Sequence, residues 1–306
     1  MKKKIPVGAA IAHAYRFGFG KMGTILNAIW LPLAAQLIVC VPAAQYAARF
    51  LEGLQAKDPS AFGMIGPLFL LYGLLVVLFF VQLTAAIETA LGLPPASRFY
   101  FPIGQKMWRL LGGYISGALA CCAVALVTFA GMMLIAYSLD LVMAMAPGTR
   151  PTVAILGGLL VAGFGYSLFY IAIRFLFLLG PINITEQILG VSQSWQMLAG
   201  NFWRTLLIVL AITTPFSLIQ FAATIFLAGM PPETEGLDEQ AKQAAELSWQ
   251  IASLNAYVDQ WYIAIPIAAV LALAYIGVAT GAQAFAYRAL TEGKSAPVAG
   301  DSLPDR

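Results

Sequence analysis

Six long apolar segments divide this chain, and they constrain its fold more than any other feature of the sequence. Each is long enough to cross the hydrocarbon core of a membrane, which takes about 20 helical residues. They extend over residues 24–44, 64–87, 110–139, 153–179, 205–230 and 263–287, and together they contain one formal charge, Arg174. Sheet edges would leave unpaired amides in lipid, so the expected spanning elements are helices.

The sequence therefore predicts an all-α, polytopic membrane protein with six transmembrane helices. Composition agrees, because 60% of the residues are hydrophobic and 10% are charged, whereas a soluble domain carries about 25% charged residues. We expect an N-terminal interfacial segment over residues 1–23, a transmembrane domain over 24–287 and a disordered tail over 288–306. The first apolar segment is longer than a signal-peptide core, so we interpret it as an uncleaved helix.

The distribution of lysine and arginine predicts the orientation. Thirteen of them lie in the N-terminal segment, the second and fourth loops and the C-terminal tail, and four lie in the other loops. Positive residues favour the cytoplasmic side. We therefore expect a bacterial inner-membrane protein with both termini in the cytoplasm.

The loop over residues 231–262 is the one sizeable segment expected outside. Its apolar residues recur at steps of three and four, for example Leu247, Ile251, Leu254 and Val258, which predicts an amphipathic helix. The polar face is acidic, whereas helices that lie on anionic lipid usually carry basic residues. We favour a lid over the outer ends of the spans, and a lipid-binding or partner-binding helix is the alternative.

A weak repeat predicts three helical hairpins in parallel orientation. The sequence around Glu88 resembles that around Glu186, and the segment 106–109 resembles 201–204; a fainter echo begins at Lys21. Each echo precedes a helix that would enter from the cytoplasm. Parallel repeats occur in some transporters, but hairpins also serve as a packing scheme, and aromatic and basic residues favour interfaces in any case.

Small and amide side chains within the spans have structural interpretations. Two Gly-xxx-Gly pairs permit close helix approach, with dimerisation as one option. Amides in lipid are expected to form hydrogen bonds between helices. The glycine pairs are Gly113 with Gly117 and Gly277 with Gly281, and the amides are Gln36, Gln82, Gln220 and Gln283.

The segment from Arg174 to Arg204 is the most distinctive in the chain. Arg174 is followed by Pro181, Glu186 and the run Ser-Trp-Gln-Met-Leu-Ala-Gly-Asn-Phe-Trp-Arg at 194–204. This pattern resembles bacterial six-helix membrane proteins that include the glycerophosphoryl diester phosphodiesterase membrane domain. The resemblance implies a fold and a location more than an activity, since some relatives fuse this unit to a soluble phosphodiesterase that this chain does not contain.

Five residues are candidates for structural or ligand contact: Arg174, Glu186, Glu88, Trp203 and Arg204. Arg174 lies about 7.5 Å from the end of its span at the helical rise per residue, so it can anchor at the interface by snorkelling or contact a substrate or lipid. As an anchor it would pair with Glu186 or Glu88. We expect Pro181, with Gly180, to end the fourth span and to return Glu186 beneath Arg174. The aromatic stretch from Trp195 to Trp203 would lie at headgroup level, before the fifth span begins.

No residue pattern predicts catalysis, a metal or a cofactor. The only histidine, His13, has no neighbouring nucleophile in sequence, and Cys40, Cys121 and Cys122 lie in apolar stretches as small fillers. No basic run suggests nucleic acid. We expect a non-enzymatic scaffold or regulatory protein, with a carrier or lipid-handling protein as the alternative and an embedded enzyme the least favoured. Its expected partners are membrane lipid, a second copy of the chain or other membrane proteins.

Overall fold

Ten α-helices and one 3₁₀ helix form the part of the chain that the structure, a computed structural model, describes: residues 3–93, 100–145, 150–186, 188–234 and 236–291. No strand occurs in these residues. The helices are α1 (Val7–Gly20), α2 (Met22–Gln55), η1 (Pro59–Met64), α3 (Ile65–Ala90), α4 (Gln105–Met145), α5 (Arg150–Leu176), α6 (Leu179–Thr185), α7 (Val191–Met197), α8 (Phe202–Ala228), α9 (Glu239–Asp259) and α10 (Trp261–Thr291).

Six of these elements are long and apolar enough to cross a membrane, and they correspond to the six segments predicted from the sequence. The all-α class and the presence of six helices with the length and composition to span a membrane are therefore confirmed for the described residues. Several helices extend beyond the apolar segments, and α2 continues to Gln55. Hydropathy marks where a helix would leave the hydrocarbon, whereas backbone hydrogen bonding continues the helix until a turn interrupts it.

The fourth candidate span, Ile155–Thr185, is divided between two helices. α5 stops at Leu176, and α6 begins at Leu179 after a short break, so Gly180 and Pro181 lie inside the first turn of α6. The prediction that these two residues end the span was wrong. Proline fits a first helical turn because no intrahelical partner needs its missing N–H. A Cβ on Gly180 would come within 2.4 Å of Ile87 Cδ1, so glycine permits α6 to pack against α3.

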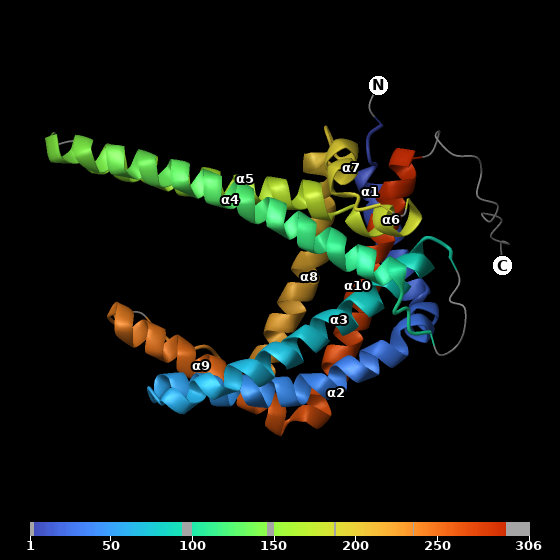
Figure 1. Ribbon diagram of the computed structural model, residues 1–306, viewed down its shortest axis with the longest axis horizontal. Helices are drawn as coiled ribbons and strands as arrows, with labels where there is room; N and C mark the ends of the chain where they lie inside the picture. Colours follow the sequence, from blue (N-terminus) through green and yellow to red (C-terminus); the bar gives the residue numbers. More distant parts are fainter. Residues whose placement is uncertain (1–2, 94–99, 146–149, 187, 235, 292–306) are drawn as a thin grey trace.

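α10 lies at the centre of the molecule and contacts α1, α2, α3, α6, α8 and α9. The other spans form close pairs, α2 with α3 and α4 with α5. Figure 1 shows these two pairs extending in the same general direction and splayed apart. The short helices α6 and α7 gather with α1 at the opposite end, near both ends of the described chain. We call α1, α6, α7 and residues 3–6 the terminal layer.

The buried core lies beside this terminal layer. One cluster joins α1, α6, α8 and α10 and includes Ile182, Ile208 and Val278. A second joins α2, α3 and α10 around Ile29, and a third joins α3, α4 and α6 around Ile87. The segment 1–23, expected only to lie at an interface, thus contributes a helix to the core.

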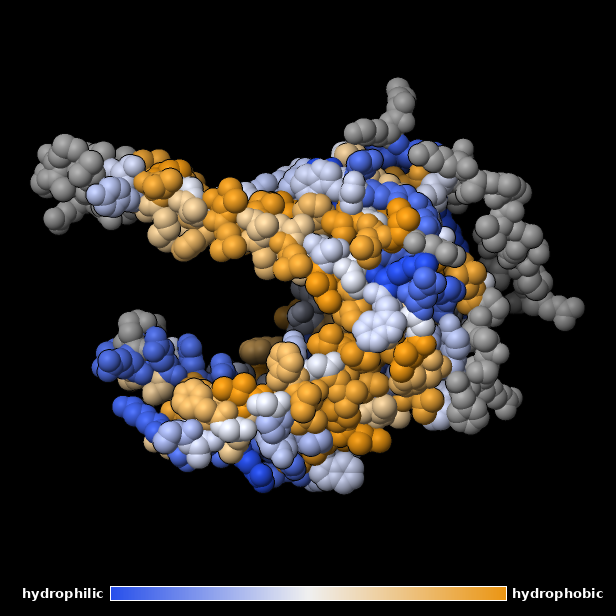
Figure 2. All heavy atoms as spheres, in the orientation of Figure 1, coloured by the Kyte–Doolittle hydropathy of each residue, from blue (hydrophilic) through white to orange (hydrophobic). Residues whose placement is uncertain are grey.

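The outer parts of α4 and α5 carry apolar side chains with few protein neighbours. Leu126, Val127, Leu134 and Leu159 are all more than half exposed. Figure 2 shows apolar atoms along this pair and on the elements opposite, with a hollow between them. Such surfaces suit lipid, because hydrocarbon solvates leucine as well as a protein interior does.

Both Gly-xxx-Gly pairs are used inside the chain. A Cβ on Gly277 would lie 3.1 Å from the Gly18 Cα, and one on Gly281 would meet the Phe17 ring, so these glycines let α1 approach α10. Gly113 and Gly117 face α5 and α6 in the same way, against Asn183, Leu176 and Leu179. Close packing within one molecule therefore accounts for all four positions.

The loop over 231–262 contains the predicted helix, α9. It begins where the Asp238 carboxylate accepts a hydrogen bond of 2.7 Å from the Ala241 N–H, a typical N-cap. α9 packs against α2 and α8. Ile251 is buried and Leu254 is half-buried, so part of its apolar face packs against the protein.

Candidate functional site

Arg174, the one charge in the predicted spans, is buried in an aromatic setting at the end of α5. Its side chain is 8% exposed. Nη1 donates a 2.8 Å hydrogen bond to the Tyr170 hydroxyl, and Nη2 donates one of 2.5 Å to the Trp195 carbonyl. The guanidinium carbon also lies 3.8 Å from the centre of the Trp195 ring, a cation–π geometry.

Main-chain contacts complete the connection between α5 and α7. The hydroxyl of Ser194, the residue before Trp195, donates a 2.9 Å hydrogen bond to the Arg174 carbonyl. The backbone of Arg174 is therefore bound to α7 as well as its side chain. The Trp195 ring packs 4.8 Å from the Phe175 ring. Nε of Arg174 is buried without a hydrogen-bond partner. Arg174 thus holds α7 of the terminal layer against α5 through Nη2 and the stacked face of its guanidinium, while Nη1 bonds within α5.

The ion pair between Arg174 and Glu186 is not formed, and this expectation was wrong. Glu186 is exposed, and its carboxylate accepts hydrogen bonds from the Gln193 amide and, at 3.1 Å, from the Tyr287 hydroxyl. The α6 helix directs Glu186 toward α10, whereas the Trp195 ring and carbonyl lie against Arg174. Glu186 therefore connects α6 to α7 and α10.

Glu88 also pairs elsewhere. This residue near the end of α3 is 4% exposed, and its carboxylate lies 2.6 Å from Lys106 Nζ in the one ion pair found among the described residues. The Tyr100 hydroxyl donates to the other oxygen at 2.5 Å. Burial and the neighbouring Glu88 carboxylate raise the pKa of Tyr100 above its usual range. Glu88 thus joins the end of α3 to the α3–α4 connection, through Tyr100, and to the start of α4, through Lys106.

Trp203 and Arg204 lie at the start of α8 and differ in their contacts. Trp203 is 63% exposed, with its ring 5.9 Å from the Tyr166 ring, which suits an aromatic residue at a membrane interface. Arg204 Nη1 donates a 2.8 Å hydrogen bond to the Ile5 carbonyl. Arg204 therefore binds the N-terminal segment of this chain.

Two asparagines act as clamps that the sequence reading did not single out. Asn201 accepts a 3.0 Å hydrogen bond from the Ile5 N–H and donates one of 3.0 Å to the Lys3 carbonyl. Asn183 is fully buried; its oxygen accepts from the Gly190 N–H, and its amide donates to the Arg109 carbonyl. Both asparagines lie just outside a predicted span in the sequence. Because a buried amide needs hydrogen-bond partners, this position could have indicated a contact between helices.

One amide pair within the spans behaves as expected. The Gln82 Nε2 donates to the Gln36 side chain and, at 3.2 Å, to the Pro32 carbonyl, joining α3 to α2. Gln220 is exposed on α8, so its side chain is not part of such a contact. The Gln283 Oε1 is buried without a hydrogen-bond partner.

Within the described residues, no group of three or more His, Cys, Asp or Glu side chains could hold a metal ion. The three cysteines are free, and Cys122 is exposed on α4. Most of these polar contacts connect different helices or a helix and a loop; the Arg174–Tyr170 hydrogen bond, within α5, is an exception.

Comparison of the sequence with models of protein families and with curated proteins, and of the structure with solved structures, finds no significant match.

Proposed function

We propose that this chain is a non-enzymatic scaffold or regulatory protein of the bacterial inner membrane. The observation that carries the proposal is the surroundings of Arg174. A charge within a span usually signals a functional site, because its burial in hydrocarbon is unfavourable. Here two of the guanidinium nitrogens and its face are occupied by Tyr170 and Trp195, which supports a structural anchor.

Membrane lipid is the partner that surrounds the spans in this proposal, and a second copy or other membrane proteins would use the scaffold. Both termini lie in the cytoplasm, which the distribution of lysine and arginine supports. The terminal layer then lies at the cytoplasmic interface, and α9 lies outside. The exposed Trp203 ring suits the headgroup region of that interface.

Three parallel hairpins remain part of the proposal. The close contacts of α2 with α3, α4 with α5 and α8 with α10 support them. The two acidic positions of the repeat, Glu88 and Glu186, both connect the end of one helix to the start of a later segment. The resemblance to the glycerophosphoryl diester phosphodiesterase membrane domain rests on the segment from Arg174 to Arg204 and gives the same location.

A lipid-handling protein is the second candidate, and one observation favours it. The α4–α5 pair and the elements opposite flank an open hollow, which is apolar along α4 and α5 and hydrophilic at the outer end of the opposite side (Figure 2). A lipid could move between leaflets along the apolar side of this hollow only if its polar headgroup found polar partners along the way, since unpaired polar groups are unfavourable in hydrocarbon.

Lipid movement in reconstituted vesicles separates these candidates. The full chain is placed in phospholipid vesicles that contain a trace of headgroup-labelled fluorescent lipid, and dithionite is added to quench the outer leaflet. The scaffold proposal predicts that the inner-leaflet fluorescence stays as protected as in protein-free vesicles. Loss of this protection in intact vesicles would overturn the scaffold proposal in favour of lipid handling. Entrapped soluble dye serves as the control for leakage.

A further inference from the structure

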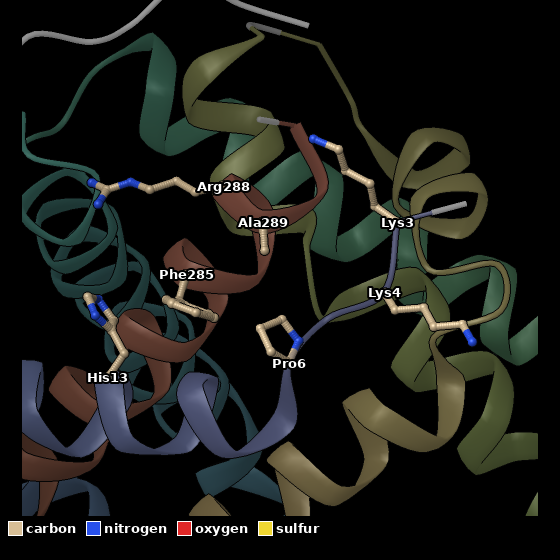
Figure 3. Close-up of a pocket in the computed structure, with 7 residues that line it drawn as sticks. All are labelled: Lys3, Lys4, Pro6, His13, Phe285, Arg288 and Ala289. Atoms are coloured by element: carbon tan, nitrogen blue, oxygen red, sulfur yellow. The ribbon is translucent and has the colours of Figure 1, made fainter. Parts of the chain in front are cut away.

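A basic pocket opens between the N-terminal segment and the end of α10. Its volume is about 480 Å³. Four of the lining side chains carry basic groups, Lys3, Lys4, His13 and Arg288, and the others include Phe285 and Ala289. Figure 3 shows how they come together from α1, α10 and the segment before α1. Residues far apart in the sequence thus form this pocket.

The charge of the pocket is of one sign. No acidic side chain is among its lining residues in the described part of the chain. Glu88, the one buried acidic side chain among the described residues, is already paired with Lys106. Three permanent cations around one cavity repel one another, so an anion that enters would relieve this repulsion as well as bind.

The cations differ in how they are held, and the charged ends of Arg288 and Lys4 point in different directions in Figure 3. Arg288 Nη2 is held by a 3.1 Å hydrogen bond to the Ala90 carbonyl, so the guanidinium is fixed in place. Its other N–H groups form a fork that matches phosphate oxygens. Lys3 and Lys4 are exposed, and Lys4 points away from Arg288 in Figure 3. A flexible four-carbon stem lets a lysine turn toward a bound anion.

Part of the pocket lining is apolar and comes from Pro6, Phe285 and Ala289. The His13 and Phe285 rings lie 5.1 Å apart, and Ala289 lies beside them on α10. A small inorganic anion would leave much of this volume empty. An organic phosphate, which has a charged group and a less polar body, would use both parts of the lining.

We propose that this pocket binds the phosphate group of a phosphate ester at the membrane interface. The ester is either the headgroup of an anionic phospholipid or a soluble organic phosphate, and the recognition chemistry is the same. The anionic leaflet attracts interfacial lysine and arginine residues in general, so a built pocket must be distinguished from general attraction. This inference does not depend on the scaffold function, since a carrier could use the same pocket.

Binding of two probes to the full chain in a neutral detergent tests the proposal. The first is short-chain dihexanoyl phosphatidylglycerol, and the second is glycerol phosphate; dihexanoyl phosphatidylcholine is the zwitterionic reference. Lys4→Gln is expected to weaken binding about fivefold, the usual contribution of one interfacial lysine. Arg288→Gln should weaken it more, because the fork contributes more than one bond. Ala289→Met fills the pocket without changing any charge and should also weaken binding.

Lys21→Gln is the matched control, because Lys21 is an exposed cation between α1 and α2 that does not line the pocket. Loss of phosphatidylglycerol binding in the pocket variants but not in this control supports the proposal. Binding of glycerol phosphate with the same pattern of losses assigns a soluble ligand, and its absence assigns the lipid.

Equal losses in Lys21→Gln and Lys4→Gln, with Ala289→Met unchanged, would overturn the proposal that this pocket binds phosphate. So would no preference of the wild type for phosphatidylglycerol over phosphatidylcholine. If Arg288→Gln does not fold, the exposed Lys4 and the Ala289 variant still decide the outcome.

Discussion

Replacing Arg174 by alanine is expected to lower the free energy of unfolding by about 3 kcal/mol. A hydrogen bond to a charged group contributes about 1.5–3 kcal/mol, and a desolvated cation–π contact adds about 1–2 kcal/mol. The variant loses the contacts with Tyr170 and Trp195. Alanine also avoids the cost of burying a charge, which offsets part of the loss. Chemical unfolding in mixed micelles measures the difference.

Two further variants separate the causes. Arg174→Lys keeps the charge but loses the planar fork and the stacking, so an intermediate loss is expected. Arg49→Ala, at an exposed arginine on α2, controls for removal of a positive charge and should change stability little. A full loss of a measurable activity in Arg174→Ala, with unchanged unfolding, would contradict the structural role and favour ligand contact through the unpartnered Nε.

The same variant tests the pairing that the sequence suggested. Because Glu186 contacts Gln193 and Tyr287 rather than Arg174, the effects of Arg174→Ala and Glu186→Ala should add. Groups without a shared partner usually give additive losses within about 0.5 kcal/mol. Strongly non-additive losses in this double-mutant cycle would instead show that Arg174 and Glu186 interact.

Asn201→Ala is expected to lower the free energy of unfolding by about 2 kcal/mol, because the Ile5 N–H and Lys3 carbonyl lose their partner and hydrogen bonds contribute about 1 kcal/mol each. Asn201 is only 2% exposed, and Ile5 is fully buried against α8 and α10. Release of this anchor should expose the N-terminal segment. Limited proteolysis with terminal sequencing should then show faster cleavage before α1.

Asn255→Ala provides a matched control. Its amide donates one 3.0 Å hydrogen bond to Glu52 at an exposed site between α9 and α2, where water can replace the lost partner. We expect a change of less than about 0.5 kcal/mol, as at most exposed positions. Similar stability losses in the two variants, or unchanged N-terminal cleavage in Asn201→Ala, would contradict the clamp.

The sequence was sufficient for the elements whose signal is local. Hydropathy located all six helices that are long and apolar enough to span a membrane, because this property depends on the composition of each segment alone. The three-four spacing of apolar residues located α9, because an amphipathic helix carries this period within its own sequence. Gly180 and Pro181 were misread because their effect depends on position within a helix and on the approach of Ile87, which no local pattern records.

The candidate site was predicted less well, since its partners are mostly not charged side chains. Matching of opposite charges led from Arg174 to Glu186, yet the partners are a carbonyl and a ring of Trp195. Lys106 was the partner of Glu88, and its short distance along the chain could have indicated this. The basic pocket joins residues from both ends of the chain, so only the folded structure brings Lys3 and Arg288 together.

Cysteine labelling in intact bacteria tests most directly the central claim, a six-span protein with its terminal layer in the cytoplasm. The background replaces the three native cysteines by alanine. Single cysteines are then placed at two exposed positions, Glu246 on α9 and Gln196 on α7. A maleimide that enters the periplasm but does not cross the inner membrane should label Glu246→Cys in intact cells, and Gln196→Cys only after that membrane is permeabilised. The reverse pattern, or labelling of both in intact cells, would contradict this arrangement.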